Sequence, residues 1–317
     1  MDLSVEYLGL KLKNPIIVGS SGLTDNIDKL KKLEENNAGA VVLKSLFEEQ
    51  INAEVYKVES SGIDYPEAHE YIREYTKDKT VNEYLKLIED AKRELSIPVI
   101  ASINCISDSE WTGFAEDIEK AGADALELNI SLLPSDPFAD SRDTEEVYYR
   151  ITEKVNSVLN IPVSLKLSYY SAGLAQLIYN LSASKNIKGI VLFNRFYNPD
   201  IDLDSLNIIS SNVFSSPEEY TLPLRWVALL SGKIDADMVA TTGIHDGRSA
   251  AKQILAGAAA VQIVSALYLN GPDYIQTIIK ELEEVIDKHG FNSVDQMRGK
   301  LSFKKDQYLC CNYATLY

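Results

Sequence analysis

The sequence predicts an α/β protein, most simply a closed (β/α)₈ or TIM barrel in which each of eight parallel strands is followed by a helix. Short apolar runs rich in β-branched residues alternate with amphipathic stretches from one end of the chain to the other. The runs are apolar at nearly every position, which is typical of strands buried on both faces. A doubly wound open sheet is the alternative fold for the same pattern.

Eight apolar runs are the predicted strands of the barrel. A chain of 317 residues with 45% hydrophobic composition can bury a core of this size within one domain. The predicted strands are residues 15–19, 40–44, 98–104, 125–129, 163–167, 189–194, 238–241 and 260–264.

The stretches between these runs have the apolar periodicity of surface helices. The predicted helices are residues 26–35, 81–95, 110–121, 145–159, 172–184, 224–230, 248–255 and 274–288. Glycine recurs just before the next strand, at Gly39, Gly122, Gly189 and Gly257. Each of these glycines is therefore expected to form the left-handed cap that ends a helix.

Two segments are longer than the repeating unit requires. Residues 45–79 come after the second strand, and residues 195–222 come after the sixth. Long connections after the carboxyl ends of barrel strands commonly build the walls of an active site. We therefore predict insertions at these two places and a functional site at this end of the barrel.

Charge and hydropathy narrow the classes of partner. The chain has 47 acidic against 31 basic residues, a formal charge of −16, which disfavours nucleic acid and anionic membrane surfaces. The longest mostly apolar stretch, residues 254–269, is shorter than the roughly 20 residues that cross a bilayer. The N-terminus lacks the basic and apolar regions of a secretory signal. We expect a cytoplasmic protein that acts on a small molecule.

Polar residues stand at the ends of the otherwise apolar strands. One such residue means little, but residues at five or six strand ends converge at the mouth of a barrel and indicate a functional site. The residues are Ser20, Ser21, Lys44, Ser45, Asn104, Asn129, Ser131, Lys166, Asn194 and Arg195.

Two lysines in this set could place positive charge at the mouth. Lys166 is the one charged residue of its predicted strand, and a cation held there would stabilise negative charge on a cofactor ring or an oxyanion. Lys44 could act in the same way. A lysine that ends a strand and extends to solvent is the alternative interpretation of Lys44.

The turns after the last two strands favour a phosphate site. Thr242 and Gly243 follow the seventh strand, and Ser265 and Ala266 follow the eighth. In barrels these two loops commonly bind phosphate, because glycine and small hydroxyl residues let backbone N–H groups approach it closely. Ordinary tight turns are the alternative. The chain has no Walker loop, no G-x-G-x-x-G and no H-E-x-x-H motif.

The order of these segments resembles the dihydroorotate dehydrogenase family over residues 8–272. The matching motifs are Leu-Lys-Asn-Pro at 12–15, Gly-Ser-Ser-Gly at 19–22, Lys-Ser at 44–45 and Glu-Leu-Asn-Ile-Ser at 127–131, together with Lys166 and Asn194. The resemblance implies one FMN-binding barrel domain over residues 1–317. By analogy with soluble members of the family, it also implies a homodimer.

The resemblance also implies roles for individual residues. Flavin contacts fall to Ser20, Ser21, Lys44, Ser45 and Lys166, and phosphate contacts to Thr242, Gly243, Ser265 and Ala266. The catalytic residues would be Lys44, Asn129, Ser131 and Asn194, with the two asparagines lining a cavity shared by flavin and substrate. The implied reaction oxidises a C–C bond by proton abstraction and hydride transfer to flavin N5, as in the conversion of dihydroorotate to orotate in pyrimidine biosynthesis.

Several family positions are altered here. The Cys or Ser that takes the substrate proton is replaced by Leu132, which cannot be a base. Two substrate-binding asparagines are missing, one after Pro134 and one in the segment 59–62, and a Gly-Thr-Gly-Gly-Ile motif is changed at residues 240–244. The candidate replacement bases are Ser131, Ser135 and Tyr197.

These changes leave the substrate open. A related CH–CH substrate is the first hypothesis. A catalytically silent or flavin-free barrel that serves as a partner subunit is the second. A third is a flavin-free barrel that binds a phosphorylated metabolite between Lys44 and Lys166.

Overall fold

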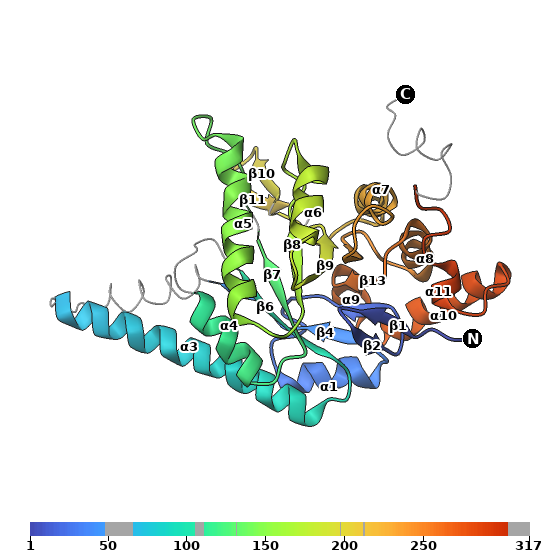
Figure 1. Ribbon diagram of the computed structural model, residues 1–317, viewed down its shortest axis with the longest axis horizontal. Coiled ribbons are helices and arrows are strands. Elements are labelled where there is room, and N and C mark those ends of the chain that lie inside the picture. The colour runs from blue at the N-terminus through green and yellow to red at the C-terminus, as the bar shows by residue number, and fades with distance from the viewer. Residues whose placement is uncertain (48–65, 105–110, 131, 197, 212, 304–317) are drawn as a thin grey trace.

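A computed structural model describes residues 1–47, 66–104, 111–130, 132–196, 198–211 and 213–303. Among these residues, eight parallel strands close into a barrel, because β3 pairs with both β13 and β4, and β4 pairs with β6. The predicted (β/α)₈ fold is confirmed (Figure 1). The barrel strands, in order around the barrel, are β3 (Ile16–Val18), β4 (Ala40–Val42), β6 (Val99–Asn104), β7 (Ala125–Asn129), β8 (Val163–Leu167), β9 (Ile187–Leu192), β12 (Asp237–Thr241) and β13 (Ala260–Ile263).

Helices surround the barrel, one in each interval between strands and one after the last. They are α1 (Ile27–Glu35), α3 (Pro66–Glu94), α4 (Trp111–Lys120), α5 (Ser141–Val158), α6 (Leu174–Ser182), α7 (Thr221–Leu230), α8 (Gly247–Ala256) and α10 (Tyr274–Lys288). The short helices η1 (Pro217–Tyr220), α9 (Ser265–Asn270) and α11 (Val294–Met297) were not predicted. The largest boundary error is in α3, which begins at residue 66 and not at 81.

The alternation of side chains along each strand divides the core into two layers. Ile17, Ala40 and Val42 belong to one buried cluster, the inner cluster, to which residues of α8 and α10 also contribute. Their neighbours Ile16 and Val18 belong to a second, the outer cluster, which packs with the other helices. This is the arrangement expected when strands are buried on both faces.

An antiparallel hairpin closes the amino-terminal end of the barrel. It consists of β1 (Val5–Tyr7) and β2 (Leu10–Leu12), and its buried side chains join the inner cluster. The backbone N–H of Leu8 donates to Asp237 at the start of β12 (3.2 Å). This hairpin covers the end of the barrel opposite to the one where the sequence predicts the functional site.

The glycine caps were predicted correctly at two of four places, Gly122 and Gly257, whose φ angles are +95° and +123°. At the first junction Asn37 takes the left-handed conformation (φ +70°). Gly39 is required there because a Cβ atom would lie 2.2 Å from the backbone oxygen of Asn14. Gly189 lies inside β9, where a Cβ atom would lie 2.9 Å from the hydroxyl of Tyr7. The prediction of caps at residues 39 and 189 was therefore wrong.

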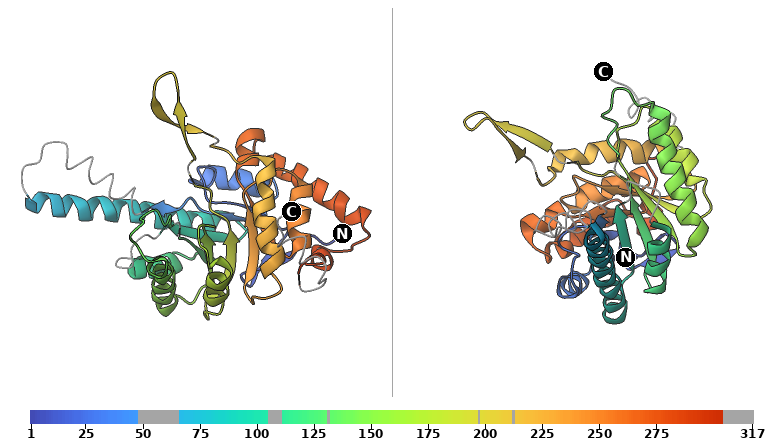
Figure 2. Two further views of the ribbon diagram at one scale, coloured as in Figure 1. Left: turned by 90° about the horizontal axis from the view of Figure 1, so that it is seen from above. Right: turned by 90° about the vertical axis from the view of Figure 1, so that its left-hand side faces the viewer.

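The two segments predicted as insertions differ in structure. Residues 66–79 belong to α3, which projects from the barrel (Figure 1), and residues 48–65 lie outside the described part of the chain. The second segment contains an antiparallel hairpin, β10 (Asn198–Asp202) and β11 (Asn207–Ser211), followed by η1. The hairpin stands away from the barrel (Figure 2) and exposes Ile201, Leu203 and Ile208. In the described residues, no helix is both long enough and apolar enough to span a membrane.

Candidate functional site

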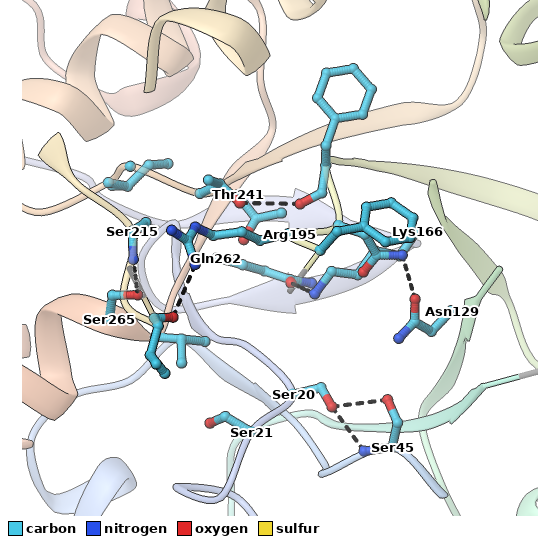
Figure 3. A pocket seen from close by; sticks show the side chains of 18 of the residues that line it. Ser20, Ser21, Ser45, Asn129, Lys166, Arg195, Ser215, Thr241, Gln262 and Ser265 are labelled. Carbon is cyan, nitrogen blue, oxygen red and sulfur yellow. Dashed lines mark hydrogen bonds between the residues drawn. The ribbon is translucent and has the colours of Figure 1, made fainter. Parts of the chain in front are cut away.

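A cavity of about 380 Å³ lies at the carboxyl ends of the barrel strands (Figure 3). Its volume falls in the range of about 300 to 1,000 Å³ that is common for small-molecule sites. Residues of β7, β8, β11, β12 and β13 and of the segments after β3, β4, β9, β11, β12 and β13 contribute to its walls. The cavity therefore lies where the sequence predicted a functional site.

Most of the predicted site residues line this one cavity. They are Ser20, Ser21, Lys44, Ser45, Asn129, Lys166, Asn194, Thr242, Gly243 and Ser265. The side chain of Ala266 is fully buried in α9 and does not line the cavity. Ser131 lies outside the described residues, as do residues 59–62 and Tyr197.

Lys166 reaches the cavity from β8, and its ammonium group is held on the side that faces the barrel interior. Its Nζ atom donates to Oε1 of Gln262 (3.4 Å, Figure 3) and lies 3.8 Å from Oε1 of Glu127. The Nε2 atom of Gln262 donates to the other carboxylate oxygen of Glu127 (2.5 Å). Burial raises the pKa of Glu127, and the neighbouring Lys166 and the hydrogen bond from Gln262 oppose that rise.

Two carboxamides meet beside this lysine. Nδ2 of Asn194 donates to Oδ1 of Asn129 (2.5 Å), which joins the segment after β9 to the end of β7. Carboxamides present both donors and acceptors, so they can orient a planar ligand that carries carbonyl and N–H groups.

Serines form the wall near β3 and β4. The hydroxyls of Ser20 and Ser45 share a hydrogen bond (3.0 Å), and the backbone N–H of Ser45 donates to the Ser20 hydroxyl (2.8 Å). Ser45 also bonds the buried hydroxyl of Ser102 on β6 (2.7 Å). Lys44 is exposed at the rim, and its backbone N–H donates to the carbonyl of Thr24 (3.2 Å).

Gly243 marks a crowded turn at the far side of the cavity. Its φ angle is +75°, and a Cβ atom there would lie 2.1 Å from the backbone nitrogen of Tyr220. Thr242 also has a positive φ (+78°), and its hydroxyl donates to the carbonyl of Phe193 (3.2 Å). A segment ending at Tyr220 is therefore packed directly against the predicted phosphate loop.

We call residues 213–220 the strap. The strap is tied to the cavity wall at Ser215, whose backbone N–H donates to the Ser265 hydroxyl (3.0 Å) and whose own hydroxyl lies 3.1 Å from Nε2 of His245. Arg195, in the segment after β9, holds the strap by two hydrogen bonds to the Glu219 carboxylate (3.0 and 3.3 Å). The hydroxyl of Ser265 is an acceptor in this contact, so its proton can be donated to a ligand.

Several wall residues were not predicted from the sequence. Phe193 and Phe196 flank Asn194, and Ser210 and Val213 enter from the hairpin and the strap. Aromatic side chains at strand ends are common in cores, so the sequence contains no local signal that these two face a cavity. In the described part of the chain, no group of three His, Cys, Asp or Glu residues could hold a metal ion.

The donors of the cavity match the polar groups of FMN. Gly243 and the hydroxyls of Ser215 and Ser265 suit a phosphate, which needs close N–H and O–H donors. The ammonium of Lys166 and the carboxamides of Asn129 and Asn194 suit the carbonyl and N–H edge of an isoalloxazine ring. The residues present therefore fit this cofactor.

Comparisons with known proteins agree with the fold and with the motifs. The family model described as dihydroorotate dehydrogenase matches residues 2–286. The chain is 28% identical over 314 residues to the catalytic subunit of dihydroorotate dehydrogenase B (NAD⁺) from Pyrococcus furiosus, covering 94% of this chain and 98% of that relative. The corresponding subunit from Thermoplasma volcanium is 27% identical over 315 residues, with the same shares covered. That from Methanothermobacter thermautotrophicus is 25% identical over 312 residues, which are 94% of this chain and 97% of the relative.

Proposed function

The chain belongs to the dihydroorotate dehydrogenase family, and on this basis we propose that it is an FMN-dependent oxidoreductase that oxidises a C–C bond of a small molecule. The observation that carries the proposal is the composition of one cavity. The hydroxyls of Ser215 and Ser265 and the crowded turn at Gly243 form one part of its wall. Lys166 and the carboxamides of Asn129 and Asn194 form another. A barrel over residues 1–317 would act as one catalytic domain.

Each part of the wall has a separate task in this proposal. Gly243, Ser265 and Ser215 hold the phosphate, while Ser20, Ser21 and Ser45 bound the cavity after the neighbouring strands β3 and β4. When bound, FMN would supply the two-electron acceptor for the oxidation. Lys166 places a positive charge where the reduced ring is negative, and Asn129 and Asn194 orient the substrate beside it.

The catalytic base is the part of the family pattern that this chain lacks. Leu132 occupies the family position, its side chain packs against the outer hydrophobic cluster, and its carbonyl accepts a hydrogen bond from Ser168 (3.2 Å). It does not line the cavity. Ser135 is exposed and does not line the cavity, so among the candidate bases Ser131 and Tyr197 are left as proposals. We therefore propose a substrate related to dihydroorotate in its CH–CH bond, with a different arrangement of polar groups.

The first experiment is the absorbance spectrum of the purified protein. We expect the two visible bands of an oxidised flavin and, on denaturation, release of a compound with the mass of FMN. A protein that is colourless and does not bind added FMN would refute the proposal. It would favour a flavin-free barrel, either a partner subunit or a binder of phosphorylated metabolites, as the second candidate function.

A further inference from the structure

A buried carboxylate lies beneath the cavity and takes no part in the function proposed above. Glu127 is 1% exposed and is not among the cavity-lining residues. It comes from β7, and its partner Gln262 comes from β13, four strands away in either direction around the barrel. The hydrogen bond between them therefore crosses the barrel interior and fixes the depth of the carboxylate.

Glu127 and Lys166 form a buried ion pair at long range. One carboxylate oxygen accepts from Gln262, and the other lies 3.8 Å from the lysine Nζ atom with no hydrogen-bond partner among the described residues. Gln262 accepts from the same Nζ atom through its carbonyl oxygen (3.4 Å). The lysine is thus held on its buried side by one hydrogen bond, to Gln262, and one ion pair, with Glu127.

Burying this carboxylate is costly for a residue with a purely structural role. Removing a carboxylate from water costs several kcal/mol, and an ion pair rarely recovers more than that cost. Burial raises the pKa of Tyr7 and of Tyr84, and the charge of Glu127 adds to the rise in each. The carboxylate of Glu127 lies 3.8 Å from the ammonium of Lys166, and Lys166 lines the proposed flavin cavity.

We infer that Glu127 is a positioning residue that holds Lys166 and partly cancels its charge, so that the reduction potential of bound FMN is lower than Lys166 alone would make it. The inference rests on the proposed function. A cation beside the ring stabilises the anionic reduced flavin, and a carboxylate 3.8 Å behind that cation weakens the stabilisation.

The test is the two-electron midpoint potential of bound FMN in wild type and Glu127→Gln. The substitution keeps the shape and removes the charge, so we expect the equilibrium constant for reduction to rise about tenfold, which is about 30 mV for a two-electron couple. The ratio of dissociation constants for oxidised and reduced FMN should change by the same factor, since the two quantities form one thermodynamic cycle. Lys166→Ala should move both quantities in the opposite direction.

The double variant Glu127→Gln, Lys166→Ala separates this role from a general effect of charge. Without Lys166 only the hydrogen bond from Gln262 opposes the rise of the Glu127 pKa caused by burial, so the neutral carboxyl group is favoured. The glutamine substitution should then have a smaller effect on the potential than it has when Lys166 is present. The matched control is Ser164→Ala, because Ser164 is the buried register partner of Glu127 on β8 and carries no charge. Its potential should equal that of the wild type.

The outcomes distinguish the inference from the function on which it rests. If the wild type binds no FMN, the proposed function fails. If FMN binds and Glu127→Gln leaves its potential unchanged, or shifts it equally with and without Lys166, the inference is overturned. Should the glutamine variant not fold, Glu127→Asp decides, since it keeps the charge but withdraws it from Lys166. An intermediate rise supports the inference, and a wild-type potential overturns it.

Discussion

Replacing Gly243 by alanine tests whether the strap and the predicted phosphate loop are packed as closely as they lie in the structure. At φ +75° an alanine costs about 1–2 kcal/mol through its own backbone strain. The new Cβ atom would also lie 2.1 Å from the backbone nitrogen of Tyr220 and 2.5 Å from the carbonyl carbon of Glu219. Backbone atoms cannot rotate away, so a further overpacking cost of about 1–3 kcal/mol is expected.

Gly9→Ala is the matched control for this substitution. Gly9 has nearly the same φ (+74°), lies in the hairpin at the opposite end of the barrel, and has nothing within 4 Å of the position of a Cβ atom. Urea unfolding of the two variants should therefore show a loss of about 1–2 kcal/mol for Gly9→Ala. The loss for Gly243→Ala should be about 2–5 kcal/mol, the sum of the strain and overpacking costs.

FMN titration of the folded variants gives the functional counterpart of this comparison. Affinity should fall at least about tenfold, or about 1.4 kcal/mol, in Gly243→Ala and remain at the wild-type value in Gly9→Ala. Equal losses of stability in the two variants would refute the close packing of the strap. Equal affinities would refute the role of Gly243 at the phosphate.

Three further predictions concern the substrate, the cofactor and the assembly. In stopped-flow experiments dihydroorotate should reduce the flavin bound to this protein about 10² to 10⁴ times more slowly than the flavin of a relative with an intact base. Leu132→Cys should not restore the rate, because this position does not line the cavity. Fast reduction of the wild type or of the variant would contradict this. Lys166→Ala should weaken FMN binding in a fluorescence titration, and an unchanged dissociation constant would count against the ring contact. The exposed hairpin around Leu203 is our candidate interface for the expected homodimer, so Leu203→Glu should halve the molar mass measured by light scattering, and a wild-type monomer would disprove it.

Local patterns were sufficient to predict the secondary structure and most of the wall of the cavity. β-branched runs, helical periodicity and turn residues act over a few neighbouring positions, so the strands were found within a few residues of their observed ends. Polar residues at the strand ends could be placed together because the carboxyl ends of parallel strands meet at one mouth. Lys166, Asn129 and Asn194 were predicted in this way.

The failures occurred where a residue's environment depends on distant segments. The sequence does not indicate that Gly189 is crowded by the amino-terminal hairpin, because the contact joins residues brought together by closure of the barrel. Helix α3 was predicted to start late because its first turns lack a clear apolar stripe. The segment 195–222 was predicted as an insertion that builds a wall of the site, but the contacts by which Arg195 and Ser265 tie the strap to the cavity could not be predicted from the sequence.

The sequence by itself determined the fold class, the family and the set of polar residues at the mouth, since each depends on residue types in chain order. The tertiary structure decided which of these residues touch. The bond from Gln262 to Glu127 joins positions 135 residues apart, and the side chain of Leu132 turns into the outer core and away from the cavity. Such contacts depend on strand register and on closure of the barrel, which arise from the summed packing of the whole chain and leave no mark in any short segment.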